Sequence, residues 1–193
     1  MITKIDEFIK RAYNTACSHG FHDEKTSVEH QMMLVISEVG EAVEADRKNI
    51  HANPAGFEKC IGIEYDQRFK DYVKDSVEDE ISDVCIRLFD MCGYFGIKPW
   101  RAGEEVLTLR NDWENEFGKM TFTEQAYALV QLLAPCCSPM ANEPSKAALN
   151  HIFGSVLFFI YYWSKNLGFD LAWHIEQKMK YNESRSYKHG KKY

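Results

Sequence analysis

The chain has 193 residues, of which 45% are hydrophobic and 27% are charged, and this balance is typical of a globular protein with a substantial core. Its formal net charge of −6 argues against binding to nucleic acid or to an anionic membrane surface. The first residues, MITKIDEFIKRAYN, carry early acids and no long apolar run, so we expect no signal peptide and a cytoplasmic location. The six cysteines show no Cys-x-x-Cys spacing, which favours reduced thiols over a zinc site.

Apolar periodicity predicts an all-α chain, because helical spacing recurs throughout and strand-like alternation is scarce. A loop is expected from Asn49 to Tyr65, where Asn53-Pro54-Ala55-Gly56 is interpreted as a helix breaker. Gly96 is expected to end the helix before it. The predicted helices, in chain order, cover residues 2–18, 27–48, 68–95 in one or two pieces, 99–117, 122–134, 144–166 and 170–186.

Two of the predicted helices carry further sequence signals. The second helix could be capped by Asp23, Thr26 or Ser27. Residues 147–164, AALNHIFGSVLFFIYYWS, carry no formal charge and approach the shortest length that spans a membrane. Polar residues within and beside this segment, such as Asn150, predict a buried helix instead.

A weak internal repeat relates residues 80–97 to residues 152–169 without a gap. The alignment places Gly96 on Gly168, but the acids of the first copy are replaced in the second. Chance similarity among helical hairpins is the alternative explanation.

The repeat predicts one all-α domain over residues 1–193 that is a degenerate tandem, or pseudo-dimeric, repeat. Residues 1–118 would form the half that holds the acids. Residues 119–193 would form a degenerate second half that ends in a basic helix. A homodimer and a monomeric pseudo-dimer are both compatible with this organisation.

Two acidic pairs, Glu38-Val-Gly-Glu41 and Glu80-Ile-Ser-Asp83, lie inside apolar stretches. Residues at i and i+3 share one helical face, so two packed helices could direct four carboxylates at one point. Crowded carboxylates repel one another unless a cation neutralises them. Oxygen ligands favour Mg²⁺, with Mn²⁺ also possible. Solvated helix faces are the plainer interpretation; a di-iron site would need Glu-x-x-His, which is absent from the sequence.

The C-terminal helix carries Lys178, Asn182 and Arg185 on one face, at i, i+4 and i+7. Such a face could hold a polyphosphate opposite the metals, although a basic last turn and a frayed tail are the simpler alternative. His22 lies in the turn Gly20-Phe21-His22-Asp23 and could line a base pocket or be only structural.

At these residues the chain resembles the MazG-like all-α nucleoside triphosphate pyrophosphatases, a superfamily that also contains dCTP pyrophosphatases and dimeric dUTPases. The resemblance covers most of residues 5–95 and 170–193, including GFHDE, EAVEADRK and KMKYNESRSYKHGKKY. The middle, 98–169, is interpreted as an added helical pair. The family pattern of ExxE, ExxD and a Lys/Asn/Arg helix falls on Glu38, Glu41, Glu80, Asp83, Lys178, Asn182 and Arg185.

The resemblance implies Mg²⁺-dependent hydrolysis of a (d)NTP to a (d)NMP and diphosphate, as house-cleaning of the nucleotide pool. It implies that Glu38 or Glu41 helps to deprotonate the attacking water and that the basic helix binds phosphate. The metal ligands would be Glu38, Glu41, Glu80 and Asp83. A non-catalytic helical bundle that binds nucleotides or a protein partner is the alternative. The base, the sugar and the number of metal ions stay open.

Overall fold

The computed structural model describes residues 4–99, 117–136 and 145–190, and all regular structure within them is helical, which confirms the all-α prediction. Most of the helix expected over 99–117 lies outside these residues. The α-helices are α1 (Ile5–Ser18), α2 (Val28–Arg47), α3 (Pro54–Lys59), α4 (Tyr65–Tyr72), α5 (Val77–Phe95), α8 (Phe122–Leu133), α9 (Lys146–Leu167) and α10 (Leu171–Ser184). Two 3-10 turns, η2 (Ala134–Cys136) and η3 (Tyr187–Gly190), complete the described elements.

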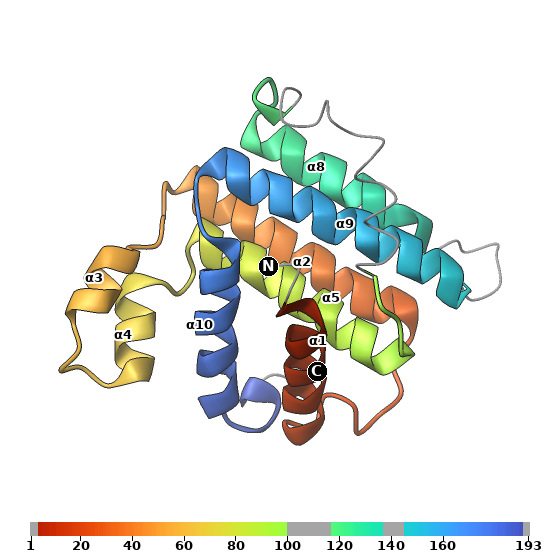
Figure 1. Cartoon of the computed structure of the whole chain (residues 1–193), viewed down its shortest axis with the longest axis horizontal. Helices are drawn as coiled ribbons and strands as arrows, with labels where there is room; N and C mark the ends of the chain where they lie inside the picture. The colour runs from red at the N-terminus through yellow and green to blue at the C-terminus, as the bar shows by residue number, and fades with distance from the viewer. Residues whose placement is uncertain (1–3, 100–116, 137–144, 191–193) are drawn as a thin grey trace.

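Helix α5 is the central element, because α1, α2, α9 and α10 all pack against it (Figure 1). Its apolar face includes Ile81, Leu88 and Phe89, which have no exposed surface. Helices α8 and α9 form a second layer over α2 and α5, while α1 and α10 lie side by side across the opposite face. This arrangement brings the acidic stretches of α2 and α5 into direct contact.

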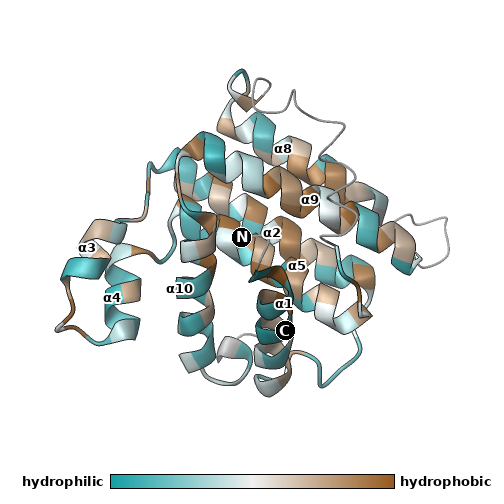
Figure 2. Ribbon diagram, in the orientation of Figure 1, coloured by the Kyte–Doolittle hydropathy of each residue, from teal (hydrophilic) through white to brown (hydrophobic). Residues whose placement is uncertain are grey.

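Helix α9 contains the long uncharged segment, and it is a buried helix as predicted. Phe153, Val156, Ile160 and Trp163 are almost completely buried. Figure 2 shows long apolar stretches on α9, whereas α4 and α10 are mostly hydrophilic on the side in view. Within the described part of the chain, none of the helices combines the length and the apolar character needed to cross a membrane.

Local sequence chemistry sets several helix ends. Ser27, one of three candidates, caps α2 by accepting a hydrogen bond from the His30 backbone N–H. Gly96 ends α5 with φ of 64°, and Gly168 ends α9 with φ of 80°. Both glycines adopt the left-handed conformation that closes a helix, which other residues rarely adopt.

The expected loop over 49–65 is wrong in one place, because it contains α3. The Asn53 side chain accepts a hydrogen bond from the Gly56 backbone N–H, and Pro54 occupies the first helical position, where its missing N–H costs nothing. This Asn-Pro pair therefore starts a helix instead of breaking one. Phe57 of α3 joins a small second core with Phe69 and Tyr181.

We predict that α1 and α5 tolerate no side chain at Gly93, where a Cβ atom would lie 2.4 Å from Tyr13 Cβ. Gly93→Ala should lower the free energy of unfolding by about 1–3 kcal/mol through overpacking. Gly40, on the exposed face of α2, has no neighbour within 4 Å, so Gly40→Ala should raise it by up to about 1 kcal/mol. Urea unfolding of both variants checks this; equal effects at the two glycines would contradict the close approach.

Candidate functional site

Helices α2 and α5 bring three of the four predicted acids together. Carboxylate oxygens of Glu38, Glu41 and Glu80 lie within 4.8 Å of one another. Glu38 and Glu80 are each only 4% exposed, whereas Glu41 is exposed to solvent. Oxygen donors at this spacing fit a hard divalent cation such as Mg²⁺ or Mn²⁺.

The fourth acid, Asp83, is engaged by a buried lysine. Lys178 Nζ lies 2.8 Å from Asp83 Oδ2 and 2.8 Å from Asp79 Oδ2. Burial opposes the charge on Lys178, but the two carboxylates raise its pKa above the ordinary value. Lys178 therefore ties α10 to α5, and the structure does not place it among the residues that line the nearby pocket, contrary to the face predicted from its helical spacing.

Asp79 is the member of this ion cluster that the motif pattern missed. Its carboxylate is fully buried and also accepts a hydrogen bond from the Asp75 backbone N–H. Burial raises the pKa of Asp79 to about 6, although Lys178 acts in the opposite direction. In the sequence, Asp79 stands in the first turn of α5, after the Ser76 cap. Acids are common at this position of a helix, so its position gives no reason to assign a function to Asp79.

The acid cluster holds more negative charge than its protein neighbours neutralise. Burial, reinforced by Asp83, raises the pKa of Glu80 to about 9. Burial and Asp83 also raise the pKa of Glu38, against the effect of Arg87, whose Nε donates a 2.5 Å hydrogen bond to Glu38 Oε1. A bound cation would relieve this repulsion, and so the electrostatics as well as the ligand types fit a metal ion.

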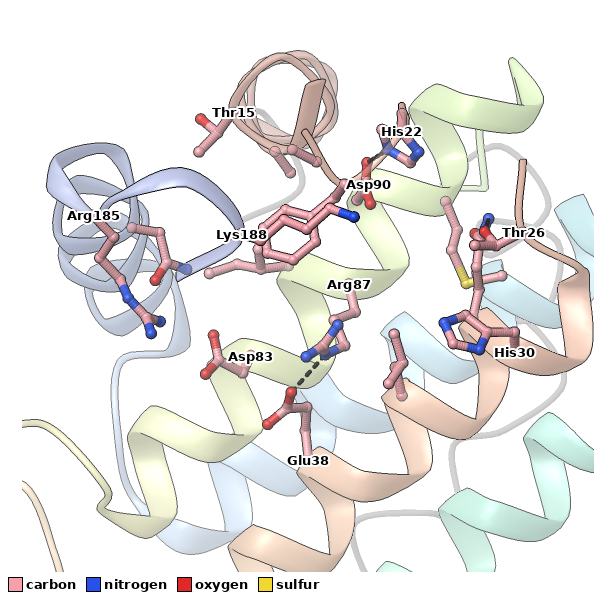
Figure 3. Close-up of a pocket in the computed structure, with 18 of the residues that line it drawn as sticks. Thr15, His22, Thr26, His30, Glu38, Asp83, Arg87, Asp90, Arg185 and Lys188 are labelled. Atoms are coloured by element: carbon pink, nitrogen blue, oxygen red, sulfur yellow. Dashed lines mark hydrogen bonds and ion pairs between the residues drawn. The ribbon is translucent and has the colours of Figure 1, made fainter. Parts of the chain in front are cut away.

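A pocket of about 280 Å³ adjoins the acid cluster, with Glu38 and Asp83 at one end (Figure 3). Asn182 and Arg185 from the C-terminal region and His22 from the turn after α1 also line it. The structure thus brings five of the predicted site residues to one cavity. Glu41, Glu80 and Lys178 are not among the residues that line it.

Cations and unpaired polar groups face this pocket from the C-terminal side. Arg185 and Lys188 line it, and neither makes an ion pair with a carboxylate of the described residues. The Arg185 guanidinium lies 5.7 Å from the ring centre of Tyr181. The Asn182 side chain is 9% exposed, and its Oδ1 has no hydrogen-bond partner among the described residues.

The segment after α10 is held in place and is not frayed over residues 185–188. His19 Nε2 lies 2.7 Å from the Arg185 backbone oxygen, and the Lys188 backbone N–H donates to the His19 oxygen at 2.8 Å. The Tyr187 hydroxyl donates to Asp23 Oδ2 at 2.6 Å. These contacts fix the two cations on the wall of the pocket.

At the end away from the acid cluster, His22 and Asp90 form a hydrogen-bonded pair. His22 Nε2 lies 2.7 Å from Asp90 Oδ1, and the imidazole stacks on Tyr94 with ring centres 5.0 Å apart. Burial raises the pKa of Asp90, and the hydrogen bond from His22 opposes this effect. His22 therefore lines the pocket, where it is bonded to a carboxylate that was not among the predicted site residues, and its role in a base pocket stays a prediction.

Comparisons with known protein families, with curated proteins and with solved structures gave no match. The site is therefore defined by its own geometry. The predicted site residues did not include Arg87, Asp90 and Lys188, although Arg87 and Asp90 share one helical stripe with Glu80 and Asp83. Their signal was present but weak, since Arg87 and Asp90 follow Asp83 at helical spacing on α5 and Lys188 follows the Lys/Asn/Arg pattern.

We predict that Glu80→Gln stabilises the metal-free protein at alkaline pH. An acid with a pKa near 9 in the folded state and near 4.5 when unfolded contributes its full stability only below about pH 4.5, and loses it as the pH rises to 9. Melting temperatures in EDTA at pH 5, 6.5 and 8 should therefore fall in the wild type and fall less in Glu80→Gln. Glu58→Gln, on the exposed side of α3, is the control; a Glu80→Gln protein that melts lower than wild type at pH 8 would show that the carboxylate is structural.

Proposed function

We propose that the chain is a Mg²⁺-dependent nucleoside triphosphate pyrophosphohydrolase, which converts a (d)NTP and water to a (d)NMP and diphosphate. The proposal rests on one observation: the carboxylate cluster and the pocket have a residue in common. Glu38 belongs both to the carboxylate cluster and to a pocket that Arg185 and Lys188 also line. A metal-bound polyphosphate matches this combination, since its anionic oxygens can meet a cation on one side and basic side chains on the other.

Each side chain has a distinct role in this proposal. Glu38, Glu41 and Glu80 hold Mg²⁺, or Mn²⁺ in its place, and Asp83 is a fourth oxygen donor at the pocket with Lys178 behind it. When bound there, the metal supplies polarisation of a water molecule and neutralisation of phosphate charge. Arg185 presents a planar fork suited to two phosphate oxygens, and the amide nitrogen of Asn182 can donate a neutral hydrogen bond to a third.

The proton of the attacking water is assigned to Glu41. Glu38 already accepts a short hydrogen bond from Arg87, which occupies one of its two oxygens. Glu41 has no hydrogen bond or ion pair with the described residues, so one of its oxygens would stay available to a water molecule when the other holds the metal. Arg87 in turn keeps Glu38 oriented toward the other two acids.

The finer fold assignment is part of the same proposal. We infer a MazG-like bundle in which residues 1–118 and 119–193 descend from one repeated unit. Support comes from the matching left-handed caps at Gly96 and Gly168 and from the packing of α9 on α5. The packing of α8 on α9 suits an added helical pair. A homodimer or a monomeric pseudo-dimer, and a cytoplasmic location, stay predictions.

We predict that the protein releases diphosphate, and not single phosphate, from nucleoside triphosphates in the presence of Mg²⁺. EDTA should abolish the reaction. Glu41→Gln should lower the rate by at least about a hundredfold, the usual scale for a positioned acid–base group. Glu44→Gln, one turn along α2 on its exposed side, should have little effect. Nucleotide binding without any product would instead indicate a non-catalytic nucleotide-binding bundle.

We predict that Arg185→Ala weakens binding of a non-hydrolysable triphosphate by about 1.5–3 kcal/mol, the range for a charge-assisted contact. Its Mg²⁺ affinity without nucleotide should stay close to that of the wild type. Lys180→Ala removes an exposed cation from α10, the helix that ends just before Arg185, and is the control. Calorimetry measures all three proteins, and equal nucleotide affinities would remove Arg185 from the site.

A further inference from the structure

The end of the pocket that lies away from the acid cluster presents hydrogen-bond acceptors without partners. Asp90 accepts from His22 through Oδ1, while its second oxygen has no partner among the described residues. The Asp90 side chain is 23% exposed and lines the cavity. The carboxylate is therefore fixed on one side by His22 and open to the pocket on the other.

Gln31 adds a second acceptor to the same cavity. Its Nε2 donates a 2.9 Å hydrogen bond to Thr26 Oγ1, and its carbonyl oxygen is buried without a partner in the described part of the chain. Gln31 and Thr26 both line the pocket, and they reach it from α2 and the segment before it. Buried acceptors without partners are costly, so a bound molecule that supplies N–H donors would be favoured here.

We propose that Asp90 and Gln31 form a base-reading subsite that selects a nucleobase with an exocyclic amino group over the counterpart with a carbonyl at the same position. The inference rests on the proposed function, because it takes the triphosphate to lie at the Glu38 end and the base at the Asp90 end. A 4-aminopyrimidine or a 6-aminopurine donates N–H to the carboxylate. A 4-oxopyrimidine or a 6-oxopurine places a second acceptor against it.

Asp90 is suited to this role by the hydrogen bonds that a carboxylate can form. An ionised carboxylate only accepts hydrogen bonds, and pairing of an aspartate with the cytosine amino group is an established readout in other complexes. With the base held in the same pose, the carbonyl counterpart places an acceptor where the amino group donates to the carboxylate, and polar sites of this kind discriminate strongly. His22 is a positioning residue, because its stacking on Tyr94 and its bond to Oδ1 hold the carboxylate in one orientation.

A different role for Asp90 would be to counter the charge of the cations in the same pocket. Arg87 lines the pocket but bonds to Glu38, and Lys188 makes no ion pair with a described carboxylate. If Asp90 served only to balance Lys188, its neutralisation would change the affinity of every nucleotide by the same factor. A base-reading role instead changes the ratio between amino and oxo partners.

The test compares two matched pairs of α,β-methylene nucleotides, CTP with UTP and ATP with ITP, by calorimetry with Mg²⁺. We expect the wild type to prefer the amino member of each pair by at least about tenfold. In Asp90→Asn the preference should fall to within about threefold, since an amide can present either a donor or an acceptor. Glu24→Gln, another pocket-lining acid, should keep the wild-type ratios.

Equal wild-type affinity for the members of both pairs would overturn the proposal, as would an equal change for all four nucleotides in Asp90→Asn. The wild-type ratios decide the question even if a variant does not fold, and melting curves of each variant show whether it does. Because the analogues are not hydrolysed, the result is separate from the activity. Diphosphate release without an amino preference would reject this subsite alone.

Discussion

The buried contact of Lys178 with Asp79 and Asp83 is the interaction on which the site geometry depends. It joins α10 to α5. Removal of one partner from a buried ion pair typically lowers the stability of the fold by about 3–5 kcal/mol, so the lysine and the carboxylates depend on one another. The contact also sets the register of α10. Asn182 and Arg185, one and two turns beyond Lys178, then reach the wall of the pocket.

The acid cluster beside this contact has a different character, because the charges of its glutamates are not paired one to one with cations of the described residues. Two buried glutamates and one exposed glutamate share a small volume. Among the described residues, Arg87 is the one cation that bonds to any of these three glutamates. Such repulsion destabilises a folded core, and groups of this kind are found most often where they serve binding or catalysis. At the other end of the pocket, the second carboxylate oxygen of Asp90 and the side-chain oxygen of Gln31 likewise lack partners among the described residues.

Sequence reasoning succeeded where the cause is local. Spacing of three residues placed Glu38 and Glu41 on one face, and Gly96 marked a helix end because of its conformational freedom. It failed where two distant segments compete for one side chain. Lys178 at i, i+4 spacing suggests a phosphate ligand, but Asp79, from a helix far away in the chain, pairs with it. Helical periodicity within one segment cannot indicate a partner that comes from another segment.

The proposed function depends on the binding of a divalent cation by the carboxylates of α2 and α5. Titration of nucleotide-free protein with Mn²⁺, followed by electron paramagnetic resonance, tests it most directly. The account predicts saturable binding in the wild type and in Arg185→Ala, Mn²⁺ displacement by Mg²⁺, and weak binding in Glu41→Gln and Glu80→Gln. Absence of saturable Mn²⁺ binding, or unchanged binding in both acid variants, would contradict it.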